Sequence, residues 1–192
     1  MAEAARGSAS RAELLELKRE HEVVDEGHRL LDERRVLLAR ELLARLNAFD
    51  QRRAAFGDLE GAAHAALSGA TEAMGLEQIQ VYPPLDGSQL KSERFKRKFI
   101  GVATERARIT AVPGREPVRP PVFEHPEARA AAEAFAGLYP EALELASDLA
   151  ELYALEAEYR RTQRRVRALE KILLPELEQQ ALALVGRLDH TL

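Results

Sequence analysis

Apolar residues recur every three or four positions along the first third of the chain. The segment from Arg11 to about Ala73 contains no proline, and twelve of seventeen positions taken in such steps are apolar. The seventeen positions are Leu14, Leu17, His21, Val24, His28, Leu31, Arg35, Leu38, Leu42, Arg45, Phe49, Arg52, Phe56, Leu59, Ala63, Ala66 and Ala70. A stripe this narrow is typical of a two-stranded helical seam. It predicts a helix about 95 Å long at 1.5 Å per residue, with Ser10 as N-cap and Glu13 as its capping-box partner.

A second stripe occupies the last third of the chain. Its positions are Leu145, Leu149, Leu152, Leu155, Tyr159, Thr162, Val166, Leu169, Leu173, Leu177, Gln180, Leu184 and Leu188. Before it, "HPEARAAAEAF" is expected to form a short separate helix, because Pro140 suits the first turn of a new one. Two long stripes can bury each other by lying antiparallel. The predicted fold is all-α dominated, a long antiparallel two-helix coiled coil with a small β-hairpin or irregular insert near its turn.

The residues between the two stripes have a different pattern. Six of the nine prolines lie there, and two runs, "EQIQVY" and "RFKRKFIGVATERARITAV", alternate or are rich in β-branched residues. Strands and turns fit such runs better than helix does. We therefore expect one domain with four segments. They are a flexible N-terminus (1–10), a long helix (11–75), a β-hairpin with a Pro-rich connection (76–125) and a helical arm kinked near Pro175 (126–192).

Composition supports a helical protein without catalytic chemistry of its own. The 192 residues include 31% charged and only 5% aromatic side chains, with no Trp, as in long helices and coiled coils. The absence of Cys excludes disulfides, thiolate metal sites and a Cys nucleophile. A net charge of −4 implies no general attraction to nucleic acid. No apolar run approaches the length of a membrane span, and the first residues do not resemble a secretory signal.

Two clusters of side chains are candidate binding sites. "HEVVDEGH", from His21 to His28, places two His and three carboxylates within two turns, but its spacing does not match a zinc-protease helix, so a partly exposed polar seam fits better. The segment from Lys91 to Arg108 contains seven basic and only two acidic residues, with Phe95 and Phe99 among them. That ribbon suits phosphates, a charged edge strand or an acidic partner. Without an RNA-binding signature, no nucleic-acid partner is expected.

Pro175 is the most informative single residue. It removes a helical hydrogen bond to the carbonyl of Lys171, at a cost of about 3 kcal/mol in a helix interior. The apolar stripe nevertheless continues beyond it, which favours a kinked helix over a helix end. If the two arms are of similar length, Pro175 falls opposite Gly27 and His28, where a glycine would let the partner helix approach a bent backbone.

Both arms and the insert resemble the D-subunit family of V-type and A-type ATP synthases and ATPases. In the C-terminal arm, "RRTQRRVRALEKILLPELE" matches the family pattern at Thr162, Arg164, Arg165, Val166, Ala168, Leu169, Glu170, Pro175, Leu177 and Glu178. In the N-terminal arm the matches are Leu14, Leu17, Lys18, Gly27, His28, Leu30, Leu31, Arg35 and Leu38. "FIGVA" resembles the strand of the insert. Arg167 replaces the usual Asn and Asp32 the usual Lys, and both chain ends depart from the family. These departures fit a shaft that engages the catalytic head less deeply, a divergent copy from a bacterial variant of the enzyme, or a repurposed shaft.

The resemblance implies a central rotor shaft without catalytic residues or cofactors. Its expected partners are the A- and B-type subunits of the hexameric head, the small F subunit of the stalk and an adaptor subunit of the membrane ring. It would be cytoplasmic, peripheral to the membrane, with no membrane insertion of its own. The residues expected to contact partners are Arg161, Arg164, Arg165, Arg167, Gly27, His28 and Pro175. Two other functions stay open at this point, a prefoldin-like holdase and a coiled-coil protein that binds nucleic acid through its basic hairpin.

Overall fold

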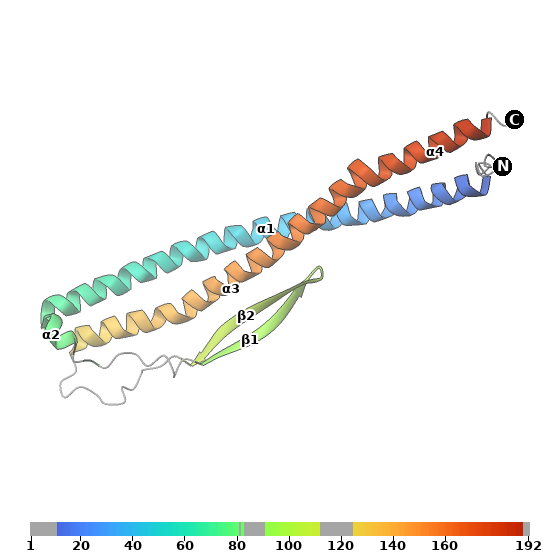
Figure 1. Ribbon diagram of the computed structural model, residues 1–192. Coiled ribbons are helices and arrows are strands. Elements are labelled where there is room, and N and C mark those ends of the chain that lie inside the picture. The colour runs from blue at the N-terminus through green and yellow to red at the C-terminus, as the bar shows by residue number, and fades with distance from the viewer. Residues whose placement is uncertain (1–10, 81, 83–90, 112–124, 190–192) are drawn as a thin grey trace, which may run out of the picture. The chain divides into compact units, whose positions relative to one another are not determined.

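A computed structural model describes residues 11–80, 82, 91–111 and 125–189 (Figure 1). The chain divides into two compact units, Met1–Arg40 with Ala157–Leu192 and Glu41–Glu156. Helix α1 (Arg11–Met74) and helix α3 (Pro126–Ala168) each contribute residues to both units. Each unit therefore contains one stretch from each predicted arm.

In the first unit, the start of α1 lies along the end of α3, the π-helical turn η2 (Leu169–Leu173) and helix α4 (Leu174–Asp189) (Figure 1). Two ion pairs give the direction of the helices: Arg34 with Glu158 at 2.8 Å and His21 with Glu178 at 3.6 Å. As the residue number falls on one helix it rises on the other, so the helices are antiparallel. The buried seam residues of this unit are Leu38, Thr162, Val166, Leu177 and Leu184.

Pro175 lies directly after a π-helical turn rather than at a helix end. The backbone N–H of Leu174 donates to the carbonyl of Leu169, five residues earlier. The burial of the side chains shows the same five-residue spacing. Leu169 and Leu174 are both half-buried in the seam, whereas Leu173, four residues after Leu169, is 36% exposed. The π turn thus inserts one residue into the helix and changes the phase of the second stripe. Leu177, Ala181, Leu184 and Leu188 carry the seam onward, in place of the predicted Gln180, which is exposed.

In the second unit, the later part of α1 lies along the first part of α3, again antiparallel (Figure 1). Ala63 and Ala70 of α1 are at most 1% exposed, and Ala131 of α3 is 5% exposed. Small side chains at a helix interface allow the two backbones to approach closely. His64 packs edge-on against Phe135, with 5.6 Å between ring centroids.

Strands β1 (Lys91–Phe99) and β2 (Val102–Ala111) form a two-stranded antiparallel hairpin in this unit. Phe99 pairs with Val102 across a two-residue turn. Ile100 and Gly101 both have positive φ, 46° and 81°, as a type I′ hairpin turn requires. The hairpin lies beside α3 in Figure 1, so it covers the flank of that helix rather than the connection between the arms.

Two local predictions were wrong. In "EQIQVY", Glu77 to Ile79 belong to the short helix α2 (Leu76–Ile79) and not to a strand; Leu, Glu and Gln are good helix formers, and Gly75 at φ 80° separates this turn from α1. Pro140 does not begin a helix but lies inside continuous α3. Seam packing on both sides of it, from Ala131 to Leu152, outweighs the missing hydrogen bond.

The predicted fold class is confirmed by two long helical arms with a small antiparallel sheet between them along the chain. Both predicted stripes are largely withdrawn from solvent; on α1 only Leu59 of the seventeen positions is exposed. The Ser10 cap and the Pro-rich connection of residues 112–124 lie outside the described residues. Within the described residues, no helix carries an apolar stretch long enough to cross a membrane.

Candidate functional site

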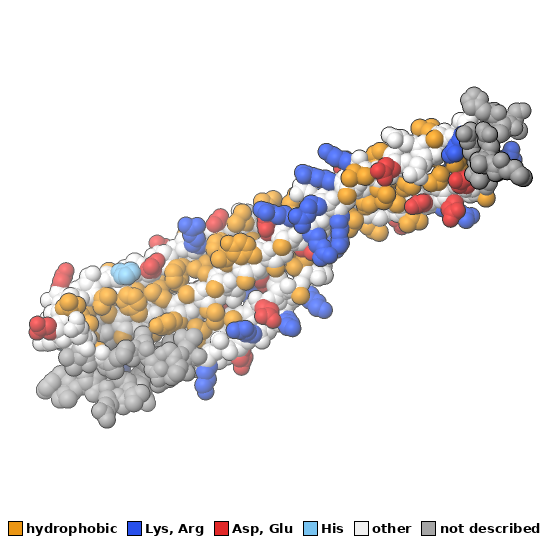
Figure 2. Space-filling view, in the orientation of Figure 1, with side chains coloured by type: hydrophobic (Ala, Val, Ile, Leu, Met, Phe, Trp, Pro, Cys, Tyr) orange, Lys and Arg blue, Asp and Glu red, His pale blue; other side chains and the backbone are white. Residues whose placement is uncertain are grey.

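The four arginines predicted to contact partners form an exposed group on α3. Arg161, Arg164, Arg165 and Arg167 are all exposed, whereas Thr162 and Val166 between them are each 2% exposed. The two buried residues hold this stretch against α1 and turn the guanidinium groups outward. No described carboxylate lies within ion-pair distance of any of the four, so their charges face solvent. Figure 2 shows Lys and Arg side chains gathered on the face in view over this part of α3.

Gly27 and His28 lie half-buried in α1, but the predicted close approach at the glycine is wrong. A Cβ added at Gly27 would meet no atom of another part of the structure within 4 Å. The ion pair between His21 and Glu178 sets the local register. It places Pro175 near Val24, in the same stretch of α1 as Gly27 and His28.

The His-rich segment of α1 forms no metal cluster with other described residues. His21 pairs with Glu178 of α4, and Asp25 pairs with Arg29 of its own helix at 2.7 Å. These two side chains therefore point to different partners.

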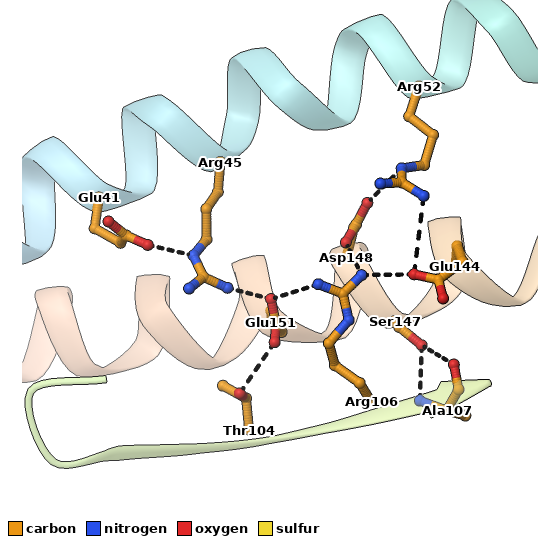
Figure 3. Close-up of polar contacts among 10 residues, drawn as sticks. All are labelled: Glu41, Arg45, Arg52, Thr104, Arg106, Ala107, Glu144, Ser147, Asp148 and Glu151. Carbon is orange, nitrogen blue, oxygen red and sulfur yellow. Dashed lines mark hydrogen bonds and ion pairs between the residues drawn. The ribbon is translucent and has the colours of Figure 1, made fainter. Parts of the chain in front are cut away.

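A partly buried ion network in the second unit was not predicted from the sequence (Figure 3). At its centre, Glu151 of α3 is 2% exposed. One of its carboxylate oxygens pairs with Arg45 of α1 and lies 3.6 Å from Arg106 of β2. The other accepts a hydrogen bond from the Thr104 hydroxyl at 3.3 Å. A single carboxylate therefore joins both helices and the hairpin.

Arg106 extends the network along α3. Its Nη2 atom donates to Glu144 at 2.8 Å and to Asp148 at 2.6 Å. Asp148 also pairs with Arg52 of α1 at 3.0 Å. Arg106 thus lies against three carboxylates at positions 144, 148 and 151, which is the spacing of one helix face. Charged hydrogen bonds of this kind are about twice as strong as neutral ones.

Ser147 joins the backbone of the hairpin to the same face of α3. Its hydroxyl accepts from the Ala107 N–H at 3.1 Å and donates to the Ala107 carbonyl at 3.4 Å. These two contacts replace the hydrogen bonds that a neighbouring strand would make. At Ala107, the outer edge of β2 is therefore bonded by a side chain of α3.

The sequence contained a signal for this network. Arg45 and Arg52 interrupt the apolar stripe of α1 seven residues apart, and Glu144, Asp148 and Glu151 recur on one face of α3. Charged residues in a seam need buried partners of opposite charge. The missing information was the position of Arg106, because nothing in the local pattern of β2 tells which helix the strand meets.

The basic residues of the hairpin fall into two groups. Arg106 is largely buried among carboxylates, whereas every residue of β1 from Lys91 to Lys98 is exposed. Near the turn, Arg45 lies 5.9 Å from the Phe99 ring centroid, and a small pocket is lined by Arg45, Arg97, Lys98, Phe99, Thr104 and Leu155. The site is therefore one of ionic attachment, and no group of described residues there could hold a metal ion.

These features define a helical-hairpin protein with an inserted β-hairpin attached to one helix by buried charges. A family model for the D subunit of ATP synthase matches residues 13–190. The chain belongs to this family. It is 27% identical over 185 residues to the D subunit of the A-type ATP synthase of Methanopyrus kandleri, covering 94% of this chain and 78% of the relative. It is 30% identical over 200 residues to the protein of the same description from Pyrococcus furiosus, covering 94% and 86%.

Proposed function

We propose that this chain is the central-stalk subunit of a rotary ATPase, which transmits torque between the catalytic head and the ion-translocating ring. The observation that carries the proposal is the extent of the family match, which runs through both helical arms and the hairpin from residue 13 to 190. Both relatives are described as subunits of A-type ATP synthases. The chain would act without catalytic residues or cofactors, at the cytoplasmic side of the membrane.

The helix pairing supports a role in force transmission. A shaft must resist sliding of its two helices past one another when torque is applied at one end. In each unit an ion pair joins α1 to α3: Arg34 with Glu158 in the first, and Arg45 with Glu151 in the second. Buried apolar residues such as Leu38 and Leu155 pack between the helices. Sliding would break both kinds of contact together.

The exposed arginines supply an asymmetric charged surface for the head. Arg161, Arg164, Arg165 and Arg167 lie on α3, and none pairs with a described carboxylate. We expect them to contact acidic loops of the A- and B-type head subunits, with Pro175 and the preceding π turn fixing the course of the helix beyond them. The small F subunit of the stalk and an adaptor of the membrane ring are the other expected partners.

Affinity purification of the tagged chain from its own cell extract, followed by native mass spectrometry, tests the proposal. Co-purification of a large assembly with catalytic subunits and a small second stalk subunit is the expected result. Recovery of the chain alone would contradict it. Recovery with diverse unfolded proteins would instead favour a holdase, and salt-sensitive recovery with nucleic acid would favour a nucleic-acid-binding protein.

A further inference from the structure

The two edges of the β-hairpin differ in their partners. The sheet has only the order β1–β2. The outer edge of β2 is bonded at Ala107 by Ser147, whose hydroxyl bonds both backbone groups of that residue. Among the described residues, nothing bonds to the outer edge of β1. An open strand edge presents a row of unpaired N–H and C=O groups, which is a template for a further strand.

The register shows which residues of β1 present these groups. In an antiparallel pair, residues directly opposite each other either bond to one another or both point outward. Ala107 points outward to Ser147, and its partner across the ladder is Arg94. Arg94 therefore points outward from the other edge, and so do Lys96 and Lys98 at the following alternate positions. The two-residue turn leads to the same assignment. Phe99 and Val102, which close it, bond to each other, so the backbone groups of Lys98, Lys96 and Arg94 point outward.

The residues with outward backbone groups are the same residues that form a basic row. Arg94, Lys96 and Lys98 share one face of the sheet, because side chains alternate along a strand. All three are exposed, and none pairs with a described carboxylate. The residues across the ladder from them are Ala107, Glu105 and Ala103. This side of the sheet therefore carries three basic residues and one acid, Glu105, and its net charge is positive.

The opposite face of the hairpin is fixed to the helices. Thr104 and Arg106 of β2 are held by Glu144, Asp148 and Glu151 of α3. A strand attached in this way loses little further conformational entropy when a partner binds its free edge. The hairpin therefore presents a preorganised edge rather than a loose loop.

We propose that β1 binds an extended acidic segment of a partner protein, which adds as a third strand along this edge. Main-chain hydrogen bonds to Arg94, Lys96 and Lys98 would give the affinity, as in other cases of strand addition. Acidic side chains at alternate positions of the added strand would lie opposite the three bases and select the partner. The inference rests on the proposed function only in taking the rotary ATPase as the assembly that supplies the partner.

Residue-level amide hydrogen exchange tests the proposal, because strand addition leaves an alternating record. The isolated chain is compared with the assembly purified from the native extract. Amides of Arg94, Lys96 and Lys98 are expected to exchange at least about tenfold more slowly in the assembly. Amides of Phe95 and Arg97, which already bond to β2, are expected to change little. Uniform slowing along β1 would indicate burial under a surface and would overturn strand addition, as would no slowing.

Two variants of one residue separate the backbone from the charge. Lys96→Pro removes an outward N–H without removing a bond to β2, and proline is tolerated on edge strands. Lys96→Gln removes only the charge. Strand addition predicts that Lys96→Pro loses more of the protection at Arg94 and Lys98 than Lys96→Gln does. Equal effects of the two would reduce the edge to a charged patch. Retained protection at Phe95 and Arg97 shows that the hairpin of each variant is folded.

A probe peptide keeps this test independent of the proposed function. A synthetic peptide of alternating Glu and Val is added to the full-length chain, with an alternating Lys and Val peptide as control. The same alternating protection is expected with the acidic peptide only, and it should weaken as salt is raised. If the purified assembly contains no ATPase subunits, the proposed function fails and the peptide result alone decides the inference. If ATPase subunits are present and β1 remains unprotected, the inference alone fails.

Discussion

Arg106 of β2 places one guanidinium nitrogen 2.6 Å from Asp148 and 2.8 Å from Glu144 of α3. The side chain is only 14% exposed, and no described residue of its own strand pairs with it. The strand is therefore attached to the helix mainly through one largely buried cation. This arrangement means that attachment of the hairpin and folding of the helices can be disturbed separately.

Replacing Arg106 by Gln is expected to release the hairpin while the helices stay folded. Among the described residues, the change leaves Glu144 and Asp148 paired only with the more exposed Arg52. Breaking a largely buried ion pair costs on the order of 3 kcal/mol. Amide exchange in β2 should become faster, with helical circular dichroism unchanged. Arg108→Gln, at an exposed position two residues later in the same strand, is the matched control and should leave exchange unaltered. Equal behaviour of both variants would contradict the attachment by Arg106.

Glu151→Gln is expected to destabilise the second unit more than any exposed acid does. The amide can still accept from Thr104, but it no longer balances Arg45 and Arg106, and charged hydrogen bonds contribute about 1.5–3 kcal/mol each. Urea unfolding measures the change. Glu133→Gln is the control, because its pair with Arg129 is exposed and worth under about 1 kcal/mol. A loss no larger than the control would mean that the network contributes no net stability.

Ser147→Ala and Ser68→Ala should change stability in opposite directions. Ala is the better helix former by a few tenths of a kcal/mol, so the exposed Ser68 of α1 should gain slightly. Ser147 is 5% exposed and bonds both backbone groups of Ala107, so its loss leaves them unpaired at about 1–3 kcal/mol. Thermal unfolding of the two variants gives the comparison, and a gain for Ser147→Ala would contradict the strand-like contact.

Pro175→Ala is expected to raise the free energy of unfolding by about 1 kcal/mol or more. Alanine restores a backbone N–H and is about 3 kcal/mol more favourable than proline in a helix interior, although the π turn already relieves part of that cost. Denaturant unfolding measures the gain. A decrease would show that the proline is needed for the fold of α4. In the assembled enzyme, unchanged coupling of ATP hydrolysis to ion transport would assign Pro175 to packing alone.

Arg164→Ala combined with Arg165→Ala should leave stability within about 0.5 kcal/mol, as is usual for exposed positions. If the arginines contact the head, ATP hydrolysis in the assembled enzyme should become less tightly coupled to ion transport. Arg19→Ala combined with Arg40→Ala removes two exposed arginines of α1 and serves as the control for net charge. Coupling that is equally unaffected in both double variants would remove the arginine group from the proposed interface.

The two seams could be predicted from the sequence because burial in a helix pair repeats with a short period. Leu38, Leu155, Val166 and Leu184 lie where periodicity places them, and each is at most 3% exposed. A hairpin was equally predictable from the alternation in the insert, although "FIGVA" was predicted as a strand and the structure places its Ile100 and Gly101 in the turn. Such features depend on residues only a few positions apart, so local pattern is sufficient to locate them.

The features that the sequence did not reveal depend on distant contacts. Pro140 continues a helix because packing around it outweighs a local rule, and no window near Pro140 contains that packing. Glu151 is a seam residue because Arg45 and Arg106 lie on either side of it, 106 and 45 positions away along the chain. The contacts of the four exposed arginines would lie on partners, so neither the sequence nor the isolated chain can define them.

The π turn before Pro175 has a consequence for how the chain can change in length. On the seam, Leu169 is followed by Leu174 after five residues, and both flanks already fit their partner helix. Losing one residue between Leu169 and Leu174 would shorten this step to four, which is an ordinary α-helical spacing. Neither half of the seam would have to rotate. This turn is therefore a place where a single-residue deletion preserves the register on both sides, whereas a deletion elsewhere in α3 or α4 would turn the seam away from α1.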